Sequence, residues 1–273
     1  MSRTLPFIDR FPTENEVERL RLLLSTYQDG TGMNKSKNGG TLPGWRDFER
    51  ACAPTFNGVA VENKFFVDVI FQLEHDPPSF YGIDCKMRRE LRSVEKKGII
   101  YIEVTNAAKL LWSHLYSKGI TETNFRNNPE LAGSSLIEAV ELLKKSSSSS
   151  YPDGAIDVNH SYYFVLLWDQ EGDYQLFQLP LTLPNPGNMQ WTCYISTRSD
   201  GTETSRLAGE SAAGVLYEWY GESGGQFKYY PSVDSALWKS QKFRLEPLPS
   251  NVEHGVIAKA KAYFPELWDA AIE

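Results

Sequence analysis

Long apolar runs are missing from this chain of 273 residues. No segment approaches the roughly 18–20 apolar residues that a membrane-spanning helix requires, and the N-terminal residues contain no apolar stretch typical of a secretory signal. Cysteine is scarce too: the three cysteines, Cys52, Cys85 and Cys193, are widely spaced and fit neither a disulfide framework nor a zinc site. We therefore expect a soluble, cytoplasmic protein that does not engage a membrane.

Motifs of nucleotide chemistry are also lacking. The sequence contains no GxxxxGK[ST] loop and no GxGxxG, and its four histidines show no metal-ligand spacing. The formal net charge of -7 argues against a surface that is basic throughout. A local basic cleft stays compatible with it, because screening at physiological salt makes nearby charges matter more than the total.

What the chain does contain is enough apolar and aromatic residues, 41% and 13%, for a folded core. Capping and periodicity predict two helices, then three strands, two helices, and further strands, with a helical C-terminus broken near Pro265. This order favours an α/β (α+β) fold in which a central mixed β-sheet is flanked by helices. We expect one domain over residues 1–273. We also predict a flexible loop at Ser146–Ser150, which is the place where a boundary between two sub-domains would fall.

The stretch Tyr81–Leu91, YGIDCKMRREL, places charge inside an apolar strand. Because side chains alternate along a strand, Asp84 and Lys86 point to one face and Cys85 to the other. Asp68 lies in the preceding strand, FFVDVIF, also between apolar residues. Phosphodiester hydrolysis requires such a set: two carboxylates hold Mg²⁺, which activates water, and a lysine positions that water and stabilises developing negative charge.

An aspartate, fifteen further residues and then Asp-Cys-Lys resembles the motif of the PD-(D/E)xK nuclease superfamily, whose best-known members are type II restriction endonucleases. The resemblance implies a restriction-endonuclease-like core with the two acids on neighbouring strands. It implies that Asp68 and Asp84 bind Mg²⁺ and that Lys86 orients the attacking water. The chain departs from the motif at position 67, where valine replaces proline.

Further acids are expected near this motif. In the family a helix upstream often supplies one, and Glu49 is placed to do so, with Asp47 as a weaker candidate. Glu103, in the apolar segment IIYIEV, is a further candidate metal ligand or a solvent-facing strand residue.

Basic residues follow the motif directly. Lys86–Lys97 contains six Lys or Arg and two Glu, and a basic patch beside a phosphate-cleaving site is what DNA binding requires. We expect Arg88 and Arg89 to contact DNA, together with Lys35 and Lys37 in a Gly- and Asn-rich loop.

A second candidate for DNA recognition is the segment RSD at positions 198–200. Arg198 pairs in principle with guanine and Asp200 with cytosine in the major groove. The segment resembles an arginine–acid element of enzymes that read CCGG-type sites, although those carry a second arginine where this chain has Gly201.

Together these features predict a Mg²⁺-dependent type II restriction endonuclease that cuts double-stranded DNA as a homodimer or larger even oligomer. Two alternatives stay open. One is a nuclease of the same fold that acts in repair or mobile-element biology without a fixed site. The other is a non-catalytic protein-binding domain, in which Asp84 and Lys86 form only a structural ion pair.

Overall fold

The computed structural model describes residues 4–36, 39–61, 66–73, 78–149, 151, 154–185, 189–197 and 200–271. The α-helices are α1 (Glu14–Ser25), α2 (Trp45–Phe56), α3 (Leu91–Lys97), α4 (Ala108–Ser117), α5 (Pro129–Ser149), α6 (Gly255–Tyr263) and α7 (Pro265–Ala270). No helix in these ranges is both long and apolar enough to cross a bilayer.

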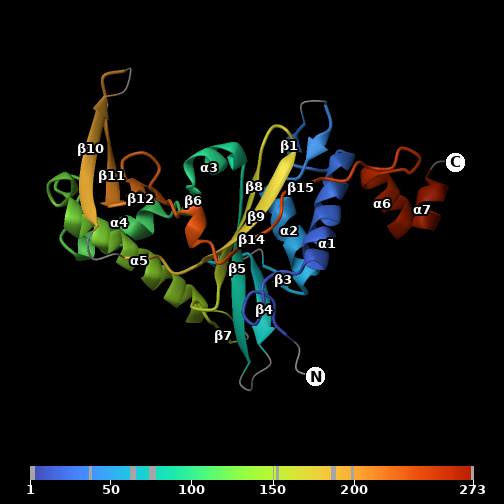
Figure 1. Cartoon of the computed structure of the whole chain (residues 1–273), viewed down its shortest axis with the longest axis horizontal. Coiled ribbons are helices and arrows are strands. Elements are labelled where there is room, and N and C mark those ends of the chain that lie inside the picture. The colour runs from blue at the N-terminus through green and yellow to red at the C-terminus, as the bar shows by residue number, and fades with distance from the viewer. Residues whose placement is uncertain are drawn as a thin grey trace.

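An eight-stranded mixed sheet forms the centre of the molecule, with α1 and α2 on one side and α4 and α5 on the other (Figure 1). Its strands are β3 (Val59–Ala60), β4 (Val69–Leu73), β5 (Ser79–Arg88), β7 (Ala155–Ile156), β8 (Tyr162–Trp168), β9 (Asp173–Pro180), β14 (Trp238–Lys239) and β15 (Phe243–Arg244). β5 is antiparallel to β4 but parallel to β7 and β8. The predicted mixed α and β architecture, with a central sheet flanked by helices, is confirmed.

A second, five-stranded antiparallel sheet was not predicted. Its strands are β6 (Ile102–Thr105), β10 (Gln190–Thr197), β11 (Glu203–Ser211), β12 (Gly214–Tyr220) and β13 (Gln226–Tyr229), in the order β10-β11-β12-β13-β6. The segment IIYIEV was expected to be the third strand of the central sheet. It pairs instead with β13, more than a hundred residues away in sequence, so no local pattern reveals its partner.

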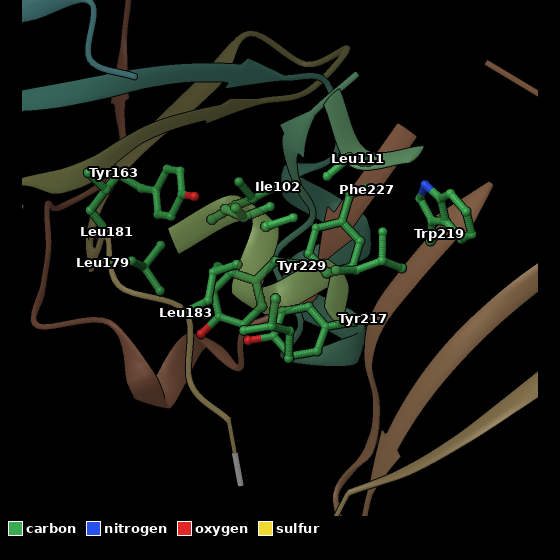
Figure 2. Close-up of a cluster of buried hydrophobic side chains, with 14 of the residues drawn as sticks. Ile102, Leu111, Tyr163, Leu179, Leu181, Leu183, Tyr217, Trp219, Phe227 and Tyr229 are labelled. Carbon is green, nitrogen blue, oxygen red and sulfur yellow. The ribbon is translucent and has the colours of Figure 1, made fainter. Parts of the chain in front are cut away.

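Two apolar cores lie on the two faces of the central sheet. Odd-numbered residues of β5, such as Ile83 and Cys85, pack with α1 and α2. Phe80, on the opposite face, belongs to the core shared by α3, α4, α5 and the second sheet. In Figure 2, Tyr163 of the central sheet lies in the same cluster as Tyr229 of the second sheet, so this core joins the two sheets. The even-numbered face of β5 is therefore turned toward the second sheet.

Most predicted helices and strands are confirmed. α1 begins with the predicted capping box between Thr13 and Glu16, and β8 and β9 form the predicted hairpin. α2 ends at Phe56, and α3 occupies most of the basic stretch Lys86–Lys97.

The predicted flexible loop in the serine tract is wrong for Ser146–Ser149, which continue α5, while Ser150 lies outside the described residues. Two serine hydroxyls form hydrogen bonds to backbone carbonyls of the same helix. Ser146 Oγ donates to the Leu143 carbonyl and Ser149 Oγ donates to the Lys145 carbonyl, both at 3.0 Å. The Ser148 hydroxyl is buried and donates to the Ile156 carbonyl of β7. Tertiary packing thus overrides the weak helix propensity of serine.

The contact between α5 and β10 depends on a glycine. A Cβ added at Gly133 would overlap the indole of Trp191. In an open helix Gly→Ala is stabilising, but here we expect Gly133→Ala to lower the free energy of unfolding by about 1–3 kcal/mol through overpacking. Denaturant unfolding measures this, with Gly40→Ala, where nothing lies within 4 Å, as the matched control. Equal stability of the two variants would contradict this packing.

Candidate functional site

The late start of β4 places Asp68 beside β5. β4 begins at Val69, which pairs with Ile83, so the amide of Cys85 extends beyond the ladder between the two strands. The Asp68 carboxylate accepts a hydrogen bond from that amide at 2.8 Å, and the Asp68 amide donates to the Ile83 carbonyl at 2.9 Å. These two hydrogen bonds hold Asp68 beside β5, at the point where the ladder between β4 and β5 has ended.

Asp84 and Lys86 share one face of β5, as the alternation of side chains predicts. Lys86 Nζ lies 2.5 Å from Asp84 Oδ1. Asp84 is 7% exposed. Burial raises the pKa of Asp84 to about 7; Lys86 opposes this rise and the nearby carboxylate of Asp68 adds to it. Burial lowers the pKa of Lys86, but the attraction of Asp84 and Asp68 outweighs it and keeps the lysine charged.

Glu49 reaches the same group of charges from α2. Burial raises the pKa of its half-buried carboxyl to about 7, and repulsion from Asp68 adds to this rise. Asp47, the weaker candidate on this helix, serves another purpose. It is buried, and its carboxylate accepts from the amides of Gly44 at 2.8 Å and Met33 at 3.1 Å, which caps α2 and anchors the preceding loop.

A cleft of about 640 Å³ opens beside these charges, and we call it the acid–lysine cleft. Asp68, Asp84 and Lys86 line it, together with residues of α5, β8 and the segment between β6 and α4. Its lining places it between the central sheet and α5, on the even-numbered face of β5.

A second lysine, which sequence analysis missed, also lines this cleft. Lys144 of α5 is 4% exposed, and Nζ donates to Glu141 Oε1 at 2.9 Å and to the Leu181 carbonyl. Burial lowers its pKa, against the attraction of Glu141 and Asp84. A lysine at helical spacing from Val140 and Leu136 was the available signal, since it occupies a core position of an amphipathic helix.

Glu103 lies elsewhere. It is on β6, in the second sheet, where Glu103 Oε2 forms an ion pair with Arg88 Nη2 at 3.4 Å. Lys228 of β13 is its neighbour across the strand pair. Among the described residues that line the acid–lysine cleft, Glu103 is absent. The structure thus gives Glu103 basic partners of its own instead of a place among the other acids.

Three of the residues predicted to contact DNA converge on one hollow. Lys35, Arg88 and Arg89 line a cavity of about 530 Å³ at the carboxyl end of β5, which we call the basic hollow. A smaller hollow of about 180 Å³, the connecting hollow, is lined by Glu49, Asp68 and Trp45 among others. It shares Asp68 with the acid–lysine cleft and Trp45 with the basic hollow.

The other residues predicted to contact DNA are less informative. Lys37 and Arg198 lie outside the described residues. Asp200 is in the turn between β10 and β11, where it accepts from the amide of Thr202 at 3.0 Å. Figure 1 shows this hairpin reaching away from β5. Asp200 is not among the described residues that line the three hollows.

Two carboxylates beside an open cleft suit a hard divalent cation such as Mg²⁺. No group of three or more His, Cys, Asp or Glu in metal-binding arrangement occurs in the described ranges. Mg²⁺ does not need such a group, because it keeps several waters and is commonly bound through one or two carboxylates and substrate phosphate. The mutual repulsion of Asp68 and Asp84, which raises the pKa of Asp84, is what a divalent cation would relieve. The residues present therefore fit Mg²⁺.

A GxSxG spacing in the chain forms only a turn between two strands. Gly221–Gly225 has the spacing GxSxG of a nucleophile elbow, which requires a strand that turns through the serine into a helix. Here Ser223 lies between β12 and β13, and its amide donates to the Tyr220 carbonyl at 3.1 Å within a hairpin. The context that would activate this serine is not present at this turn.

Comparison with family models, with curated proteins and with solved structures finds no match to this chain. The chemistry of the site therefore carries the argument for function.

The raised pKa of Glu49 makes stability depend on pH. Its carboxyl holds its proton up to about pH 7 in the folded chain but has a usual value of 4.5. The folded state binds more protons between these values, so stability falls as pH rises through this window. Without metal, we expect Glu49→Gln to remove part of that fall, gaining about 1 kcal/mol at pH 8 relative to pH 5 after allowance for solvent screening. Urea unfolding in EDTA measures it; parallel pH profiles of variant and wild type would contradict the assignment.

Proposed function

We propose that this chain is a Mg²⁺-dependent endonuclease of the PD-(D/E)xK type, with a restriction-endonuclease-like core, that cuts double-stranded DNA as a type II restriction enzyme. The observation that carries the proposal is the convergence of Asp68, Asp84 and Lys86 on one cleft, with Glu49 beside them. The connecting hollow, which shares Asp68 with that cleft and Trp45 with the basic hollow, links this group to the basic hollow. Three separate segments of the chain contribute to this group: α2, the residue before β4, and the middle of β5.

The division of work follows from position. Asp68 and Asp84 would hold Mg²⁺, which would polarise the scissile phosphate and activate water for attack. Lys86, kept charged by the two aspartates, orients the attacking water and stabilises negative charge as it develops on the phosphate. Glu49, with its pKa near 7, is suited to accept a proton or to complete the metal site at neutral and alkaline pH.

The basic hollow supplies the phosphate contacts. Lys35, Arg88 and Arg89 line the basic hollow, which the connecting hollow links to Asp68. We expect the DNA strand whose scissile phosphate lies at Asp84 to run along this surface. Arg92 does not line the basic hollow; it pairs with Asp169 and Glu171 in the turn between β8 and β9. Cutting both strands of a palindromic site then calls for two copies of the chain related by a two-fold axis, which is a homodimer or a larger even assembly.

Digestion of a long phage DNA tests the proposal. We expect sharp fragments with Mg²⁺ and intact DNA with EDTA. Asp84→Asn removes a metal-binding oxygen at constant shape, and Lys86→Met removes the positive charge. Each should lower cleavage by about 10²–10³-fold or more. Asp234→Asn, in the exposed turn Val233–Ser235, is the control and should cut like wild type.

The pattern of products separates the alternatives. Smeared, Mg²⁺-dependent products that vanish in Asp84→Asn would indicate a nuclease of this fold without a fixed site, as in repair. Intact DNA with every divalent metal tested would overturn the nuclease proposal and leave the 2.5 Å pair of Asp84 and Lys86 as a structural ion pair.

A further inference from the structure

An exposed tryptophan, Trp45, lines both the connecting hollow and the basic hollow. Trp45 is the first residue of α2 and is 49% exposed. It lines the connecting hollow together with Glu49 and Asp68, and it also lines the basic hollow. An isolated exposed apolar residue needs no explanation, but this ring borders a continuous path from the acids to the basic hollow.

The basic hollow combines an apolar interior with a basic rim. Its apolar lining comes from Met33, Met87 and Trp168. Three basic side chains and one acidic side chain also line it: Lys35, Arg88, Arg89 and Glu90. A volume of about 530 Å³ falls in the range of small-molecule sites. Contact with phosphate needs only the charges. The sulfur and indole groups add a surface against which a flat, apolar part of a ligand packs.

Both tryptophans already take part in stacking with guanidinium groups. Arg46 lies over the Trp45 ring at 5.0 Å, and Arg89 lies over the Trp168 ring at 5.3 Å. Nucleobases outside a duplex are held in the same way, against aromatic rings and guanidinium planes. Phosphates on either side of such a base would meet Lys35 and the arginines.

We propose that the basic hollow binds an unstacked nucleobase of the DNA strand whose phosphate lies at the acid–lysine cleft, with Trp45 as its stacking partner. This inference rests on the proposed nuclease function, and it adds to it that the bound DNA is unpaired at one position next to the cut. A duplex that contains an unpaired nucleotide avoids the cost of unstacking, so it should bind more tightly than a fully paired duplex of equal length.

Binding in EDTA, where no cleavage occurs, tests this separately from catalysis. Fluorescence anisotropy compares a labelled paired duplex, the same duplex with one bulged thymidine, and the single strand. We expect the wild-type chain to bind the bulged duplex about tenfold more tightly than the paired duplex, on the scale of base–aromatic stacking. Trp45→Ala should abolish the preference, while Trp45→Phe should retain most of it. Tyr263→Ala, an exposed aromatic on α6, is the matched control and should bind like wild type.

The outcomes separate this inference from the proposed function. If the chain cuts DNA but binds all duplexes equally, or if Trp45→Ala keeps the preference for the bulge, the inference is overturned and the nuclease stands. If a Trp45-dependent preference is found in a chain that cuts no DNA, the unpaired-base site stands and the nuclease proposal fails. Absence of DNA binding at low salt would overturn both.

Discussion

The crowding of two carboxylates around one lysine on the face of β5 is the constraint on which this site depends. Asp84 is buried, Asp68 adds a second negative charge, and Lys86 at 2.5 Å is the cation that offsets them. The arrangement exists because β4 starts late, so that Asp68 takes the amide of Cys85 in place of a strand neighbour. Charge that would be costly in a closed core is tolerated at this strand edge, because the acid–lysine cleft opens there.

The parts of this account that were predictable from sequence are those set by local periodicity. Alternation along a strand is sufficient to place Asp84 and Lys86 on one face and Cys85 on the other. A short turn between two apolar segments is sufficient to make β4 and β5 antiparallel neighbours, which brings Asp68 to β5. The capping box at Thr13 is likewise local. These features need no knowledge of the rest of the chain.

The parts that failed depend on contacts distant in sequence. The sequence left Glu103 open between a metal ligand and a solvent-facing strand residue. In the structure β6 leaves the central sheet and pairs with β13, where Arg88 and Lys228 are the neighbours of Glu103. Lys144 was overlooked because charged residues near a serine tract are ordinarily solvated. Packing of α5 across β7 and β10 buries Lys144 and keeps the tract helical. Residues of α5, β6 and β13 all belong to the hydrophobic cluster that joins the two sheets.

The most direct measurement of the central claim is calorimetric titration of Mg²⁺ into the DNA-free chain at pH 8, where Asp84 and Glu49 have lost their protons. The account predicts saturable binding in the wild-type chain and in Asp234→Asn, binding that weakens at pH 6, and loss of binding in Asp84→Asn and in Asp68→Asn. Binding that is equal in all four proteins and at both pH values would contradict a metal site at these two aspartates.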